Sequence, residues 1–204
     1  MRVQENAQAK HGNVEKAAKR KAYDMAYIGF FVVVIAICSW ITIPAAVPFT
    51  LQTFAVFLSV ILLGGRRGTL AVAVYILLGA IGIPVFSGCR GGIGVLMNST
   101  GGYLAGFLCS ALIMWAAERF FGTKVWVQVL SMMLGLAACY TVGTAWFLFV
   151  YLRNTGAVSL MTVLLWCVIP FIVPDLVKIV LALMLGRSLR KPLSGIMQED
   201  RRKR

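Results

Sequence analysis

Long apolar segments dominate this chain and limit its possible folds more than any other feature. Apolar side chains account for 60% of the 204 residues, and charged side chains account for only 13%. A soluble globule of this length cannot bury so many apolar groups in one core. A bilayer can hold them in spans of about 20 residues each. The sequence therefore predicts an all-α integral membrane protein.

Proline, glycine and charged residues divide the apolar sequence into six predicted transmembrane helices. Pro44 and Pro84 end the first and third spans, because proline fixes φ and restricts the residue before it. The glycine-rich residues 85–100 are expected to form a connection between the third and fourth spans. The expected spans cover residues 25–43, 49–63, 68–83, 101–119 and 125–151, followed by a sixth that begins near Pro174.

The apolar run over residues 156–186 is too long to be a single span. One helix of this length would measure about 45 Å, compared with about 30 Å for the hydrocarbon core of a bilayer. Pro170 and Pro174 divide the run. We therefore expect a short interfacial helix over residues 157–168, and then the sixth span starting near Pro174, because proline suits the first turn of a helix.

A stripe of small residues marks one face of the fifth span. Gly135, Cys139 and Gly143 are spaced four apart, so they lie on the same helical face. Small residues let a second helix approach closely in a membrane. We expect the stripe to serve helix packing.

Lysine and arginine are concentrated on one side of the predicted topology. Six lie within residues 2–21 and seven within residues 187–204. The positive-inside rule places both of these tails in the cytoplasm. The loops on the same side carry Arg66, Arg67, Arg119 and Lys124, whereas the opposite loops carry only Arg90 and Arg153. The net charge of +13 thus indicates topology and attraction to anionic lipid, and it does not favour nucleic acid.

The charge distribution also defines the domain organisation. Residues 1–24 are predicted to be a basic cytoplasmic tail, residues 25–189 a six-helix transmembrane domain, and residues 190–204 a second basic cytoplasmic tail. The protein is expected to cross the membrane several times, with both termini on the cytoplasmic side.

Two ionisable residues lie within the predicted membrane segments, Asp175 and Lys178. Such groups cost about 2.5–3.5 kcal/mol each on insertion scales, so each one suggests a function. Their spacing of three places them on one face of the last span, where they can pair with each other or bind a ligand. Gln52 adds an amide that either binds a ligand or joins two helices. Arg90 is the single charge of the outer connection, and it is either solvated or attracts an anionic ligand.

The sequence lacks the groups that several other functions require. It contains no G-x-x-x-x-G-K-[ST] phosphate loop, no G-x-S-x-G and no H-E-x-x-H. The single histidine, His11, lies in the polar tail, and none of the five cysteines belongs to a C-x-x-C pair. A binding or transport protein is therefore favoured over an enzyme, with no cofactor or metal expected.

Six short motifs follow one another along the chain. They are VPFTLQT at residues 47–53, LLGAIGIPVF at 77–86, GGIG at 91–94, TGGYLAGF at 100–107, GTAW at 143–146 and PDLVK at 174–178. Together they resemble the biotin-specific substrate-binding (S) components of energy-coupling factor (ECF) vitamin importers, the BioY family. The resemblance covers residues 22–189, although Asn98-Ser99 stands where the family usually has Gly-Pro. It implies a location in the cell (inner) membrane.

The resemblance implies a six-helix S-component fold and capture of biotin at the outer face. It also implies a partner module of one transmembrane coupling protein and two ATPases, with transport by a homo-oligomer of this chain alone left open. The candidate ligand-binding residues are Asp175, Lys178, Gln52, Tyr103, Gly88 and Arg90.

The chemistry of biotin fits these residues. Its ureido ring offers two N–H donors and a carbonyl acceptor, its ring system and side chain are apolar, and its carboxylate is anionic. Asp175 can accept from a ureido N–H, and Gln52 or Lys178 can serve the remaining polar ends. Alternatives are an S component for thiamin or riboflavin, a small intramembrane enzyme that uses Asp175 and Lys178 for proton transfer, and a structural subunit.

Overall fold

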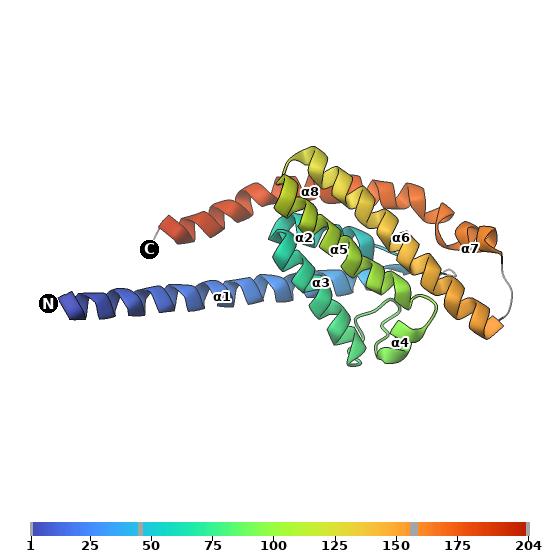
Figure 1. The fold of residues 1–204 in the computed structure, drawn as a ribbon, viewed down its shortest axis with the longest axis horizontal. Coiled ribbons are helices and arrows are strands. Elements are labelled where there is room, and N and C mark those ends of the chain that lie inside the picture. The colour runs from blue at the N-terminus through green and yellow to red at the C-terminus, as the bar shows by residue number, and fades with distance from the viewer. Residues whose placement is uncertain (1, 45–46, 156–158, 203–204) are drawn as a thin grey trace.

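A computed structural model describes residues 2–44, 47–155 and 159–202, and most of these residues are helical (Figure 1). Two short strands, β1 (Thr42–Ile43) and β2 (Phe49–Thr50), pair in an antiparallel ladder after the first helix. The predicted all-α class is confirmed apart from this ladder. The helices are α1 (Arg2–Trp40), α2 (Gln52–Leu63), α3 (Gly65–Ala80), α4 (Ile93–Met97), α5 (Gly101–Phe121), α6 (Val125–Thr155), α7 (Leu160–Cys167) and α8 (Ile169–Arg202).

Four segments of the described chain are long and apolar enough to cross a bilayer. Between 28 and 33% of each segment is buried inside the bundle, so most of its apolar surface is left for lipid. The first three correspond to the first, fourth and fifth predicted spans, and the last contains the sixth predicted span together with most of the predicted interfacial helix. The protein is embedded in the membrane. The four segments are Lys21–Trp40, Gly101–Phe121, Val125–Asn154 and Leu160–Leu189.

Helix α2 is shorter than the second predicted span, whereas α3 has the length of the third predicted span but lies three residues earlier in the sequence. They contain 12 and 16 residues, which corresponds to about 18 and 24 Å of helix. The prediction that the second span begins at residue 49 is wrong, because Phe49 and Thr50 pair with β1 instead of joining the helix. The two helices meet at Gly64, whose φ of 81° is a conformation that glycine adopts at low cost. The count of six membrane passes stays a prediction.

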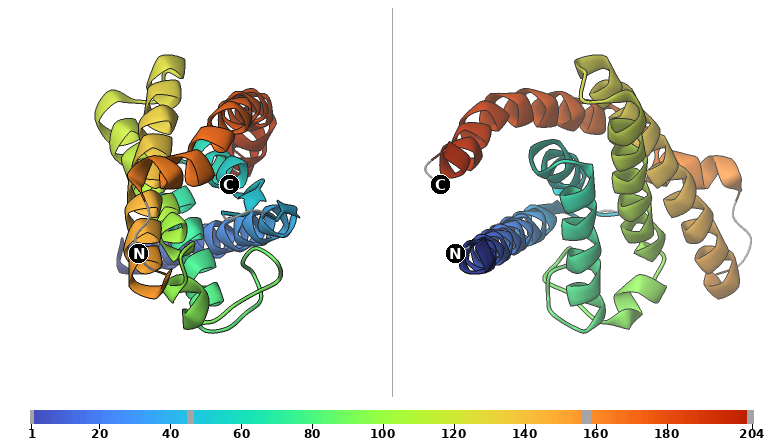
Figure 2. Two further views of the ribbon diagram at one scale, coloured as in Figure 1. Left: turned by 90° about the vertical axis from the view of Figure 1, so that its right-hand side faces the viewer. Right: turned by 60° about the vertical axis from the view of Figure 1, so that its left-hand side comes forward.

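Both chain termini lie at the same end of the bundle, while α4 and α7 lie at the opposite end, here called the loop end (Figures 1 and 2). Helix α1 has 39 residues and α8 has 34, so they are about 59 and 51 Å long. Both extend past the other helices at the terminal end (Figure 1). An even number of passes, as predicted, produces this arrangement.

The last predicted span begins earlier than expected. Helix α7 covers Leu160–Cys167, and α8 begins at Ile169, so that a single residue separates the two helices. The predicted start near Pro174 is therefore wrong. Pro170 occupies the first turn of α8, where a missing N–H removes no helical hydrogen bond. The predicted interfacial helix is present but shorter, and residues 157–158 of its predicted range lie outside the described residues.

The predicted small-residue stripe of α6 is confirmed, and it faces α5. A Cβ on Gly143 would lie 2.3 Å from the ring of Tyr103. On α5, a Cβ on Gly106 would lie 2.9 Å from the Cα of Cys139. A Cβ on Gly135 would lie 3.2 Å from the nearest atom of α5. The stripe therefore sets the close approach of the two helices.

Replacing Gly68 by alanine is expected to destabilise the protein by about 1–3 kcal/mol, as overpacking typically does. A Cβ on this α3 residue would lie 2.5 Å from the Cα of Val60 on α2. Because the contacted atom is backbone, the two helices would have to move apart. Gly29→Ala in α1 is the matched control, since no described atom lies within 4 Å of its Cβ position. We expect a lower Tm in detergent for Gly68→Ala only, and equal Tm values would contradict the packing.

Candidate functional site

A cavity opens at the loop end of the bundle, where segments distant in sequence converge. It is lined by β2, the start of α2, the connection that carries α4, and the facing sides of α5, α6, α7 and α8. Its empty volume is about 760 Å³, including solvent at the mouth. A single water in the liquid occupies about 30 Å³. The cavity can therefore hold a small organic molecule.

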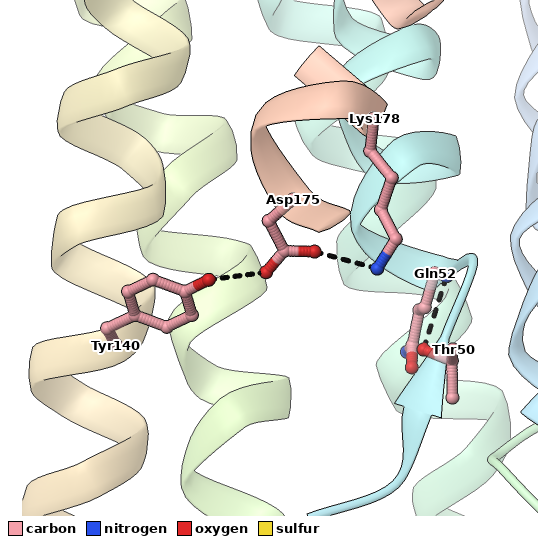
Figure 3. Close-up of polar contacts among 5 residues, drawn as sticks. All are labelled: Thr50, Gln52, Tyr140, Asp175 and Lys178. Atoms are coloured by element: carbon pink, nitrogen blue, oxygen red, sulfur yellow. Dashed lines mark hydrogen bonds and ion pairs between the residues drawn. The ribbon is translucent and has the colours of Figure 1, made fainter. Parts of the chain in front are cut away.

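Asp175 and Lys178 lie side by side on α8 and line this cavity (Figure 3). The Nζ of Lys178 lies 2.7 Å from Oδ1 of Asp175, and each side chain is only 5% exposed. Tyr140 of α6 donates its OH to Oδ2 of Asp175 at 2.6 Å (Figure 3). A carboxylate has about four acceptor positions, and these two bonds occupy only two. Asp175 thus retains acceptor capacity for a ligand.

Lys178 also contacts the aromatic ring of Phe49, which lies beside the cavity in β2. Its Nζ lies 4.1 Å from the ring centroid of Phe49, and the face of an aromatic ring attracts a cation. An ammonium has three donors, and Asp175 takes one of them. The remaining donors can serve an acceptor on a ligand. The pair as a whole is neutral, so its burial leaves no uncompensated charge.

Gln52 opens α2 and presents its amide to the cavity. Its Nε2 donates to the OH of Tyr75 at 2.9 Å, and its backbone N donates to Oγ1 of Thr50 at 3.2 Å (Figure 3 shows the latter). No polar side-chain atom of the described residues is both fully enclosed and unpaired. The Oε1 of Gln52 makes no hydrogen bond within the described chain, so it faces open space. The amide therefore offers an unused acceptor.

The rest of the cavity is mainly apolar. Tyr103 of α5 lies on one wall, and its OH shares a hydrogen bond of 3.2 Å with Oγ1 of Thr144 on α6. Aromatic and aliphatic side chains of four segments complete the walls. They include Phe86, Leu104, Phe107, Leu136 and Phe171.

A tight turn forms part of the mouth. The backbone N of Phe86 donates to the O of Arg90 at 2.9 Å, and the N of Arg90 donates back at 3.3 Å. Arg90 lines the cavity, and its Nε donates to the O of Ser87 at 3.3 Å. Gly88, in the same turn, is exposed with a φ of 71° and does not line the cavity. The structure thus brings five of the six candidate residues together and leaves Gly88 outside.

Two tyrosines of this region were not candidates in the sequence. Tyr140 contacts a residue 35 positions away, and Tyr75 contacts one 23 positions away. Both lie in apolar stretches, where a tyrosine is usually a packing residue. The one available signal is that a buried phenol OH needs a hydrogen-bond partner.

The site has the chemistry of a binding pocket. It combines a carboxylate, a cation, an amide oxygen and aromatic walls, which together suit a small ligand with an apolar body and a few polar groups. Among the described residues, no group of three or more His, Cys, Asp or Glu side chains is placed to hold a metal ion.

Comparisons with known proteins agree with this description. The BioY family model matches residues 9–195. The chain is 39% identical over 164 residues to the biotin transporter BioY of Thermotoga maritima, covering 80% of this chain and 93% of that protein. It is 32% identical over 171 residues to the probable biotin transporter BioY of Pyrococcus horikoshii, covering 83% and 98%.

A solved structure shares the fold. The crystal structure of the S-component for biotin from an ECF-type ABC transporter matches with a TM-score of 0.75 and 26% identity, over 85% of this chain and 93% of that one. The expected S-component bundle is therefore confirmed, and so is the resemblance carried by the six motifs. With a family model that spans nearly the whole chain and relatives matched over almost their full length, the chain belongs to the BioY family.

Proposed function

We propose that this chain binds biotin in the cavity and acts as the S component of an ECF-type importer. The observation that carries the proposal is the buried cluster of Asp175, Lys178 and Tyr140 facing an apolar cavity, in a chain whose relatives are named biotin transporters. A transmembrane coupling protein and two ATPases are its partners. The chain itself binds and releases its ligand without chemistry on it, and it uses no cofactor.

The polar groups of biotin have matching partners in the cavity. Asp175 and the Oε1 of Gln52 accept hydrogen bonds from the ureido N–H groups, and Lys178 donates to an oxygen of the ligand. Tyr103 and the apolar walls contact the ring system, and Arg90 at the mouth attracts the carboxylate. Each buried polar group left unpaired would cost about 1–3 kcal/mol, which lets the site reject analogues that lack one.

Equilibrium binding to the purified protein in detergent tests this function. Titration calorimetry with biotin should give saturable binding with one site per chain. Thiamin and riboflavin, the ligands of the alternative hypothesis, should give no heat at the same concentrations. Saturable binding of either vitamin without binding of biotin would assign the chain to another substrate, and no binding of any of the three would favour a structural subunit.

The loop end is proposed to face the outside of the cell and both termini the cytoplasm. Residues 25–189 then form the membrane domain, and residues 1–24 and 190–204 form basic tails that attract anionic lipid and bind no nucleic acid. The basis is the excess of lysine and arginine at the terminal end. The cavity accordingly opens toward extracellular biotin, across a bacterial inner membrane.

Cysteine labelling of intact cells tests this orientation. In a background without the other four cysteines, the exposed Cys89 is expected to react with an impermeant maleimide added outside. In a cysteine-free background, Thr123→Cys should stay unlabelled, because Thr123 is exposed between α5 and α6 at the opposite end. It is preferred to Gly122, whose φ of 79° disfavours a side chain. The reverse labelling pattern would invert the topology and the outward-facing site.

Tyr140→Phe is expected to weaken biotin binding by about 10- to 150-fold, because a hydrogen bond to a charged group contributes about 1.5–3 kcal/mol. The loss frees Oδ2 of Asp175 and removes one contact that holds the carboxylate in place. Tyr151→Phe on the same helix is the control, since its OH makes no hydrogen bond to other described residues while its ring stacks on Phe147. Equal affinities of the two variants would show that Tyr140 is only a packing residue.

A further inference from the structure

A chain of buried hydrogen bonds lies behind Gln52, outside the group of residues that contact the cavity. Tyr75 of α3 accepts from Nε2 of Gln52 at 2.9 Å and donates to the backbone O of Val85 at 3.0 Å. The Oγ of Ser39 on α1 lies 2.6 Å from the same O of Val85 and 2.7 Å from the O of Ala36, and its single proton can be donated to one of them at a time. Tyr75 is 1% exposed and Ser39 is fully buried. Four segments therefore meet at one carbonyl and one phenol oxygen.

The donors and acceptors in this series of hydrogen bonds determine the orientation of the Gln52 amide. A phenol has one O–H donor, and in Tyr75 that donor is used by the O of Val85. The Tyr75 oxygen can then only accept, so the NH₂ end of the Gln52 amide must point to it. The Oε1 end must point the other way, toward the cavity. A backbone carbonyl cannot become a donor. With the Ser39 proton donated to the O of Ala36, the Val85 carbonyl accepts from Tyr75, and this sets the direction of the hydrogen bonds from the Val85 end.

Tyr75 is also held rigidly in place. Its ring packs edge-to-face against Phe86, with ring centroids 5.6 Å apart. The ring of Phe86 in turn fills the space beside Gly79, where a Cβ would lie 2.0 Å from it. The phenol ring is thus held against Phe86, and Phe86 is itself packed against α3, so the buried OH has little freedom to follow a rotating amide.

We propose that Tyr75 is a positioning residue that holds the Gln52 amide with its oxygen toward the cavity, so that this wall selects ligands presenting an N–H donor. The inference rests on the proposed function, since the donors in question are the ureido N–H groups of biotin. Tyr75 does not touch the ligand. It determines which end of Gln52 the ligand meets.

A double-mutant cycle separates this role from a structural one. Tyr75→Phe keeps the ring and its packing, leaves Ser39 in place to donate to the Val85 carbonyl, and frees the amide to rotate. We expect biotin affinity to fall by about 3- to 10-fold, the effect of one lost neutral hydrogen bond. In the Gln52→Ala background the same change should have no further effect, because there is no amide left to position. Additive losses would overturn the proposal.

Ser39→Ala is the matched control. It removes the other hydroxyl within reach of the same carbonyl and leaves the pair of Tyr75 and Gln52 intact. We expect less than a twofold change in affinity. If Ser39→Ala weakens binding as much as Tyr75→Phe does, the effect arises from the turn at Val85 rather than from Gln52, and the proposal is wrong.

Ligand discrimination gives an independent readout. The probes are biotin and its two cyclic carbamate analogues, in each of which a ring oxygen replaces one ureido N–H. The parent protein should reject one analogue more strongly than the other, and both Tyr75→Phe and Gln52→Ala should reduce that preference.

If Tyr75 had only a structural role, its replacement would weaken the binding of all three ligands equally. Should Tyr75→Phe not fold, an unchanged preference in Gln52→Ala alone would overturn the proposal. If the parent protein binds biotin but distinguishes the two analogues no better than its variants do, only this inference is refuted. If the parent protein binds no biotin, the proposed function is refuted as well.

Discussion

A chain that carries Asp175→Asn and Lys178→Met together is expected to fold and to bind no biotin measurably. Asparagine keeps an oxygen that can accept from Tyr140, and methionine keeps an apolar stem and a sulfur over the ring of Phe49. Removing both charges at once leaves no unpaired ion in the membrane. The fold is therefore preserved, while the charged acceptor and the cation that serve the ligand are lost.

The single variants carry different consequences. Asp175→Asn should weaken binding by about 10- to 150-fold, because a neutral acceptor replaces a charged one that contributes about 1.5–3 kcal/mol. Lys178→Met leaves the carboxylate of Asp175 buried with only Tyr140 as a partner, and stranding a buried charge costs about 3–5 kcal/mol. It should therefore lower both the Tm and the affinity.

Calorimetry with biotin and a parallel thermal melt of each variant check these outcomes. The double variant is decisive because a purely structural ion pair makes the opposite forecast. If the two residues only stabilise α8, removing both should restore stability together with near-native affinity. A folded double variant that binds within a few-fold of the parent would remove Asp175 and Lys178 from the site.

Reconstituted alone in liposomes, the protein is expected to bind biotin and yet never to accumulate it against a gradient. Concentrative uptake needs an energy source, and the sequence contains no phosphate loop with which to bind ATP. The measurement is the internal biotin concentration at steady state, with labelled biotin outside and no ion gradient. Internal biotin should at most equal external biotin.

In the positive control, the coupling protein and the two ATPases are reconstituted into the same liposomes. ATP is supplied on the side of the membrane where the ATPases lie. Accumulation should then appear and should stop when ATP is omitted. Accumulation by the isolated chain once an ion gradient is imposed across the liposome membrane would instead support transport by a homo-oligomer that is driven by that gradient and needs no ATPase module. It would leave biotin binding in place and refute the role as a component that depends on partners.

The general architecture could be predicted because bilayer thickness and charge asymmetry act on the sequence locally. Apolar length and flanking arginines located three of the four long segments to within a few residues, whereas the fourth, Leu160–Leu189, begins well before the predicted start near Pro174. The start of α2 could not be predicted in this way, because Phe49 and Thr50 pair in a ladder with residues six and eight positions earlier, and such pairing is decided by tertiary structure. The start of α8 was placed at the wrong proline because either proline suits a first helical turn.

The residues of the candidate site could be predicted where a polar side chain stands in an apolar stretch of the sequence. Asp175, Lys178 and Gln52 are conspicuous in apolar runs, and all three line the cavity. Tyr140 and Tyr75 are not conspicuous, because a tyrosine in an apolar helix is common and its partner is set by how the helices pack. Gly88 lies beside Arg90 in sequence, but the turn directs it away from the cavity.

The ion pair of α8 also bears on how the protein enters the bilayer during synthesis. Asp175 and Lys178 are one turn apart on the same helix, so the salt bridge forms as soon as that turn forms, before any other helix arrives. The segment leaving the translocon then carries a neutral pair rather than two separate ions, each of which would oppose insertion by about 2.5–3.5 kcal/mol. If another helix supplied the counter-ion, the ion pair could form only after the two helices had assembled. Because α8 brings its own, biogenesis of the last membrane segment does not depend on the completed bundle, and Tyr140 need only dock afterwards.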